Sequence, residues 1–335
     1  MTLPELGDLS TMLVWGAVTA YTVALIAYSL DLARQAELAG SATRVARQAG
    51  TATVVAAGAP GGGATVRVAT TLAPDRPRSA PRRRSKARGI ARSTTVLGLV
   101  LQVAAVVLRG VAAGRTPWAN MYEFALVGSM VAMAVLLLVL RRRDLPFLGV
   151  AVTGLTVLSL ALALLVFFIQ ADGVQPALDS YWIVIHVGVA ITASGVFTVA
   201  FAASVLQLLK DSRERGSVAL GRPSLRWLDT VPRVTELEAL AFRLNAVGFV
   251  LWTFTVIAGA IWAEHAWGRY WGWDPKEVWS FVIWVVYAAY LHARSTRGWA
   301  GRRAAWFVLV GYGCVLANFT IVNLFFTGKH TYSGL

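Results

Sequence analysis

Long apolar runs separated by short polar breaks dominate the chain. Eight segments hold about the 20 apolar residues that a helix needs to cross the roughly 30 Å hydrocarbon layer of a bilayer. They lie at about 11–30, 94–113, 119–140, 147–169, 181–209, 244–263, 277–293 and 304–326. The segment 277–293 is the shortest and opens with Glu277. The pattern predicts an all-α, polytopic integral membrane protein with about eight transmembrane helices.

Composition supports this fold class. Of the 335 residues, 57% are hydrophobic and 14% are charged, whereas an average soluble domain carries about 25% charged residues. An ordinary water-soluble enzyme and a disordered protein are therefore excluded. The single cysteine, Cys314, leaves no internal disulfide or CxxC redox pair.

The positive charge is concentrated in one stretch. The chain has 31 Lys and Arg against 17 Asp and Glu, a formal net charge of +14. Residues 31–93 hold twelve of the basic and three of the acidic residues and are otherwise rich in small residues. We expect a transmembrane helix at 1–30, a disordered cytoplasmic linker at 31–93 whose basic end contacts anionic lipid headgroups of the bilayer, and a transmembrane domain at 94–335. No aromatic residue interrupts the linker for base stacking, so no nucleic-acid partner is expected.

Basic residues in the other breaks set the orientation, since cytoplasmic loops are enriched in Lys and Arg. They follow the third segment at 141–143, fill the connection at 210–243 and precede the last segment at 294–303. Eight spans with both termini outside place these groups inside. Arg109 and Arg115, near an outer turn, are mild exceptions.

Tryptophan is concentrated between the sixth and seventh segments, on the outer side. Six of the 13 tryptophans lie between positions 262 and 284: Trp262, Trp267, Trp271, Trp273, Trp279 and Trp284. An interfacial aromatic belt is one interpretation. The mixture of these rings with glycines and charged residues favours another, a platform for a flat, apolar ligand with polar ends.

Three of the four histidines, His186, His265 and His330, are predicted near this outer segment. His292 follows Glu277 by 15 residues, so a helix would place it about 22 Å deeper. Two neutral imidazoles facing a planar aromatic pocket can hold haem iron axially. A zinc site fits less well, because few carboxylates and no thiolate cluster are near.

Carboxylates near the outer face leave a proton pathway as a competing interpretation, with Glu123, Asp274 and Glu277 as carriers. Glu123 starts the third segment and is either a snorkelling interfacial group or part of an outer cavity. Asn318 and Asn323 in the last segment are expected to form hydrogen bonds between helices.

Several motifs together resemble a known family. The segment WGWDPKE at 271–277 resembles the tryptophan-rich "WWD" motif of haem-handling membrane proteins. The stretches SYWIVIH at 180–186, YLHAR at 290–294, and GYGCVLAN at 311–318 with HTY at 330–332 resemble three histidine-bearing segments of one subfamily, and PWANMYEF at 117–124 also matches. These residues are similar to CcsA (ResC) type proteins of system II cytochrome c biogenesis, rather than to CcmC or CcmF.

The resemblance covers roughly 94–335 and implies roles for individual residues. His186 and His330 would be external axial ligands of the haem iron, and His292 a ligand of an intramembrane haem. His265 is a departure from the family pattern and an alternative external ligand. The haem-binding platform, within a WWD segment at about 264–281, would comprise Trp267, Trp271, Trp273, Asp274 and Trp279. Arg269 or Lys276 is expected to neutralise a haem propionate.

The resemblance also implies partners and a location. The protein would act in the bacterial plasma (inner) membrane with a CcsB/ResB-type subunit, as part of a cytochrome c synthase. It would hold haem b non-covalently and present it to an apocytochrome c that carries CxxCH, a motif this chain lacks. A secondary transporter with a structural tryptophan belt and a permanently haem-loaded electron carrier are the alternatives.

Overall fold

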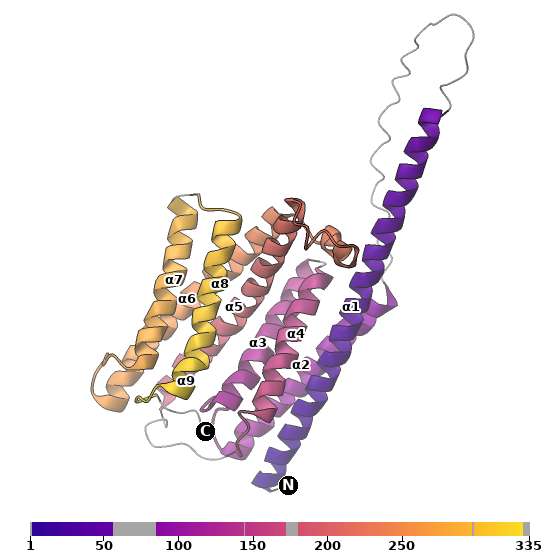
Figure 1. Ribbon diagram of the computed structural model, residues 1–335. Coiled ribbons are helices and arrows are strands. Elements are labelled where there is room, and N and C mark those ends of the chain that lie inside the picture. The colour runs from indigo at the N-terminus through magenta and orange to yellow at the C-terminus, as the bar shows by residue number, and fades with distance from the viewer. Residues whose placement is uncertain (1, 56–84, 144, 172–179, 297, 331–335) are drawn as a thin grey trace, which may run out of the picture.

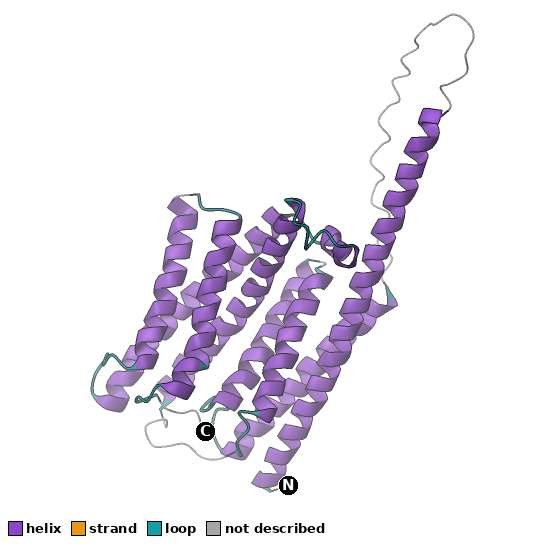
Figure 2. Ribbon diagram, in the orientation of Figure 1, coloured by secondary structure: helices purple, strands orange, loops and turns teal. Residues whose placement is uncertain are grey.

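The computed structural model describes residues 2–55, 85–143, 145–171, 180–296 and 298–330. These residues form helices and connecting loops without strands (Figure 2). The elements in chain order are α1 (Leu3–Val55), α2 (Lys86–Ala113), α3 (Met121–Arg142), α4 (Pro146–Leu165), α5 (Tyr181–Glu214), the 3-10 helix η2 (Pro223–Thr230), α6 (Val234–Trp267), α7 (Pro275–Thr296), α8 (Arg302–Phe319) and α9 (Ile321–Phe325) (Figure 1). The prediction of an all-α fold is confirmed.

Seven helices in the described part of the chain are long and apolar enough to cross a membrane: α1 to α6, and α8 continued by α9. The eighth predicted span, 277–293, is the helix α7, which lies beside α8 (Figure 1). It has 22 residues but does not meet the same criterion. Charged residues near its ends, such as Glu277 and Arg294, and the tryptophan, tyrosine and histidine side chains along the helix lower its mean hydropathy.

Successive long helices run in opposite directions, so the start of α1, the α6–α7 loop and the end of α9 lie at one end of the bundle (Figure 1). We call this end the outer end, following the predicted orientation. The helix η2 and the C-terminal part of α1 lie at the opposite end.

The structure differs from the predicted linker at both of its limits. Helix α1 continues through Val55, and α2 begins at Lys86, so only 56–85 separate them, of which 56–84 lie outside the described residues. The Arg88 guanidinium donates to Asp31 at 2.9 and 3.0 Å, and Ser85 caps α2 while also donating to Asp31. The stretch after residue 30 is polar but rich in alanine and long straight side chains, which favour helix. These polar residues mark the end of the predicted membrane span, but the helix continues through them.

Buried apolar side chains form two main clusters. One joins α1 to α5 with η2 and the start of α6, and the other joins α5, α6, α7 and α8. Helix α5 belongs to both clusters. Phe197 on α5 stacks on Tyr287 of α7 at 3.9 Å between ring centroids, and Gly248 gives that ring room against α6. Packing on both sides therefore fixes α5, the helix that carries His186.

Candidate functional site

His186 is held by helix α6 in one orientation. Its Nδ1 lies 2.9 Å from the carbonyl oxygen of Thr255. Because a carbonyl can only accept, Nδ1 carries the proton and Nε2 keeps its lone pair. Gly259, one turn further along α6, makes room for the ring, since a Cβ there would lie 2.6 Å from Cε1 of His186. No described group bonds Nε2, so this nitrogen is available to a ligand.

His330 is held in an equivalent way by a carboxylate. It lies in the coil that follows α9, and its Nδ1 is 2.7 Å from Oδ2 of Asp274. Burial alone would raise the pKa of Asp274, but the hydrogen bonds from His330 and from the backbone N–H groups of Lys329 and Lys276 outweigh it and lower that pKa. A carboxylate or carbonyl behind an imidazole is the arrangement that orients metal-binding histidines.

The two imidazoles meet at one buried indole. Trp262 lies parallel to His186, with centroids 6.1 Å apart at 7°, and its centroid is 5.6 Å from that of His330. Trp267 packs edge-on against His330 at 4.9 Å. Both histidines line the same cavity of about 200 Å³ at the outer end, which we call the outer cavity. The structure thus brings His186 and His330 together.

Aromatic side chains form much of the outer cavity wall: Trp118, Phe124, Trp252, Tyr270, Trp271 and Phe319. Two polar atoms of the lining residues are buried without a partner among the described residues, Nε1 of Trp118 and Oδ1 of Asn318. Buried polar groups in proteins normally have hydrogen-bond partners. These two therefore fit a ligand that is mostly apolar and has polar ends. The backbone oxygen of Asn318 accepts from Lys276 Nζ at 2.7 Å.

The sequence DPKE at 274–277 starts helix α7. Asp274 accepts from the Lys276 N–H at 3.2 Å, and Glu277 reaches back to the N–H of Asp274 at 3.0 Å and of Gly272 at 2.7 Å. Proline at the first helical position suits this start. The arrangement is close to a capping box, in which two side chains satisfy the free N–H groups of a helix start. Asp274 therefore couples the start of α7 to His330.

The predicted platform residues do not all face the outer cavity. Trp271 lines it, whereas Trp273 is 76% exposed and has a φ of 60°. A bulky residue with positive φ is strained, so the backbone there turns this ring outward at a cost. Trp279 is absent from the described lining. Trp262, which the predicted platform did not include, is the tryptophan that contacts both histidines, and its place in the tryptophan cluster is the sequence signal for it.

The two predicted cations differ. Lys276 lines the outer cavity and forms no described ion pair. Arg269 lies 3.5 Å from Glu277 and over the ring of Trp267, at 5.8 Å from its centroid. It is therefore already paired.

The other two histidines lie elsewhere. His265 is exposed and not part of the cavity lining; its Nδ1 lies 2.8 Å from the Ile261 carbonyl. His292 is exposed on α7 toward the opposite end. Among the described residues no three His, Cys, Asp or Glu side chains gather as a metal-binding cluster.

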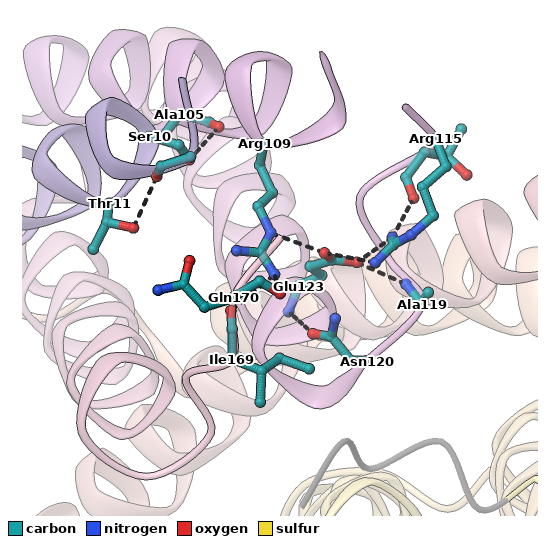
Figure 3. A network of polar contacts seen from close by, with 12 residues as sticks. Ser10, Thr11, Ala105, Arg109, Arg115, Ala119, Asn120, Glu123, Ile169 and Gln170 are labelled. Atoms are coloured by element: carbon teal, nitrogen blue, oxygen red, sulfur yellow. Dashed lines mark hydrogen bonds and ion pairs between the residues drawn. The ribbon is translucent and has the colours of Figure 1, made fainter. Parts of the chain in front are cut away.

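Glu123 forms a buried ionic network beside the outer cavity (Figure 3). It is fully buried and bonded by Arg109 at 2.9 Å, by Arg115 at 2.7 Å and by the Ala119 N–H at 2.9 Å. It is therefore neither a snorkelling group nor a cavity-lining one. Both arginines that depart from the charge rule pair with this one carboxylate. The network holds the turn before α3, which carries Trp118.

Known proteins resemble this chain in sequence. The family model "Cytochrome C assembly protein" matches residues 118–330. A "Cytochrome c biogenesis protein CcsA" of Prochlorococcus marinus is 33% identical over 70% of this chain and 80% of its own length. That of Parasynechococcus marenigrum is 35% identical over 74% and 88%.

A solved structure shares the fold. The "Cytochrome c Heme Lyase CcmF" superposes with a TM-score of 0.60 at 16% identity, over 95% of this chain and 47% of that one. This chain therefore spans about half of that protein. The family match and the relatives show that the chain is a CcsA-type member of the cytochrome c assembly protein family.

Proposed function

We propose that this protein holds haem b non-covalently between His186 and His330 at the outer face of the membrane and presents it to an apocytochrome c. The observation that carries the proposal is the pair of imidazoles on one cavity. Each has its Nδ1 committed to an acceptor, Thr255 or Asp274, and its Nε2 free. Neutral imidazoles with free Nε2 atoms are axial ligands for haem iron.

The residues would position the haem rather than perform acid–base chemistry. The substrate supplies vinyl groups that become joined to the thiols of a CxxCH segment, which belongs to the apocytochrome because this chain has no CxxCH. Cys314 lies within α8 and is partly buried, so it is not placed to supply a thiol. Holding reacting groups at contact distance can lower a barrier by about 7–11 kcal/mol in the best cases.

Lys276 is the cation that best fits a haem propionate. It lines the outer cavity with its Nζ on a neutral carbonyl, whereas Arg269 is paired with Glu277. A charge-assisted bond in a site shielded from water is stronger than a neutral one. Trp118 Nε1 supplies a second donor without a described partner.

The dimensions of the outer cavity imply that it opens to admit haem. Its volume of about 200 Å³ is below the roughly 300–1,000 Å³ of ordinary ligand pockets. His186 is fixed in a long helix, whereas His330 lies in coil. We infer that the segment carrying His330 moves when haem enters.

The position of His292 supports a role for a second protein subunit. It is exposed on α7 toward the inner end, and the other three histidines lie near the outer end. A second axial ligand for a haem at His292 would come from a partner, of the CcsB/ResB type, in the plasma membrane of a bacterium. Together the two subunits would form a cytochrome c synthase in which haem crosses from the inner to the outer site.

The test is the visible spectrum of the protein purified with its partner. We expect a six-coordinate, low-spin haem band that weakens in His186→Ala and in His330→Ala and returns with added imidazole. His265→Ala is the matched control and should keep the wild-type band. Absence of haem from cells that make c-type cytochromes would refute the proposal. A band that depends on His265 instead of His330 would replace one ligand.

A further inference from the structure

A large groove lies at the end of the bundle opposite the outer cavity. Helices α1, α4 and α5 line it, and η2 closes its mouth. Its volume is about 940 Å³, near the upper limit of about 1,000 Å³ for ligand pockets. The haem-binding residues proposed above are not part of its lining.

The groove has the length of one bilayer leaflet. On α1 its lining runs from Ser29 at the deep end to Ser41 at the mouth, which at 1.5 Å per residue is about 18 Å. One leaflet contributes about 15 Å to the hydrocarbon layer. The side chains between are mainly apolar, such as Leu32, Leu155 and Phe201. The groove can therefore hold an acyl chain parallel to the helices.

The mouth carries two opposite charges. The side chain of Arg226 on η2 reaches α1, where its NH1 would lie 3.4 Å from a Cβ placed on Gly40. The neighbouring carboxylate of Asp229 is taken by Arg213 at 2.7 and 2.8 Å. Glu37 lies on the α1 side of the mouth. In the described part of the chain, neither Arg226 nor Glu37 forms an ion pair.

The remaining polar groups at the groove do not compete for a headgroup. The hydroxyls of Ser29 and Ser41 donate to carbonyl oxygens of their own helix, at 2.8 and 2.9 Å. Trp227 lines the mouth, and indole rings favour the depth of lipid headgroups.

We propose that this groove binds one phospholipid whose headgroup carries both a phosphate and a primary ammonium, as in phosphatidylethanolamine. The phosphate pairs with Arg226 and the ammonium with Glu37, while an acyl chain fills the groove. A purely anionic headgroup would satisfy the arginine and be repelled by Glu37. This site is independent of the proposed haem function and would fix η2 against α1.

The test is native mass spectrometry of the full chain, released from equal mixtures of phosphatidylethanolamine and phosphatidylglycerol with identical acyl chains. We expect one retained lipid, with ethanolamine favoured about fivefold, the factor given by roughly 1 kcal/mol for one exposed ion pair. Glu37→Gln should abolish the preference while keeping a lipid. Arg226→Gln should weaken retention of both lipids.

Two further variants separate lipid binding from folding. Ala36→Phe places a ring in the apolar part of the groove and should prevent retention of either lipid. Glu236→Gln, an exposed change outside the groove, should behave as wild type. Equal retention of both lipids by the wild type, or no effect of Glu37→Gln, would overturn the proposal. Loss of the lipid from the groove when the partner subunit binds would also overturn the proposal, because a helix of that subunit would then occupy the groove.

Discussion

A single methyl group on Gly259 should displace His186, the proposed haem ligand. In Gly259→Ala the new Cβ would lie 2.6 Å from Cε1, 3.0 Å from Nδ1 and 3.3 Å from Nε2 of His186. The ring cannot stay in place, because contacts below 3.0 Å are essentially never seen. To reach an ordinary contact of 3.4 Å it must move by about 0.8 Å, the difference between 3.4 and 2.6 Å. That movement alters the bond to Thr255, now 2.9 Å long.

The size of the effect follows from two separate costs. Overpacking in a filled interior costs about 1–3 kcal/mol, and loss of one hydrogen bond costs about 0.5–1.5 kcal/mol. We therefore expect a destabilisation of about 2–4 kcal/mol. Misplacing a ligand by about 1 Å can also lower the rate of a reaction that depends on positioning by about 100-fold. The rate of haem attachment to cytochrome should therefore fall by a larger factor than the amount of folded protein.

The assay compares haem content per protein, the low-spin band and thermal unfolding. Gly313→Ala is the matched control, because a Cβ on Gly313 meets nothing within 4 Å in α8. It should keep the spectrum and gain about 0.5–1 kcal/mol from alanine replacing a helical glycine. Added imidazole should restore the band of Gly259→Ala. If that variant keeps both the wild-type haem content and an unshifted band, the placement of His186 as a ligand is refuted.

Three further changes test other parts of the outer end. Glu123→Gln should destabilise the protein by about 3–5 kcal/mol in thermal unfolding, because it leaves buried guanidinium groups unpaired, whereas Glu236→Gln should cost less than about 1 kcal/mol. Trp273→Gly should stabilise the loop by relieving the positive φ and should leave the haem band unchanged, as measured by unfolding and by the spectrum. The lowered pKa of Asp274 means that its contribution to stability is present above about pH 4 and is lost as the pH falls further. Asp274→Asn should remove that acid-side loss and weaken the hold on His330, which the pH dependence of unfolding would show.

Most of the fold was predictable because a bilayer constrains it strongly. A spanning segment must satisfy its own backbone hydrogen bonds, so long apolar runs predict helices directly. The limits of α1 and α2 were not predictable in this way. Polar residues after 30 end the apolar run but not the helix, and the ion pair of Asp31 with Arg88 depends on tertiary contact.

The candidate site was predictable in its residue types but not in its geometry. Histidine and tryptophan near one face indicated haem, and His186 and His330 do share a cavity. The sequence could not tell that Trp271 faces the cavity while Trp273 faces away, because one backbone angle decides this. Nor could it show that Trp262 contacts both imidazoles, since that depends on how α5 packs on α6.

The motif at 274–277 can be recognised from the sequence as the start of a helix. Aspartate followed by proline and, three residues on, glutamate is a readable helix start, and it explains these residues without any ligand. Yet the same carboxylate of Asp274 also bonds His330, which no local pattern contains. The cap of α7 and the partner of His330 are here one side chain. A loss of haem in an Asp274 variant therefore has two causes. A Glu277 variant disturbs the cap without removing the bond to His330, although Glu277 also lines the outer cavity and pairs with Arg269.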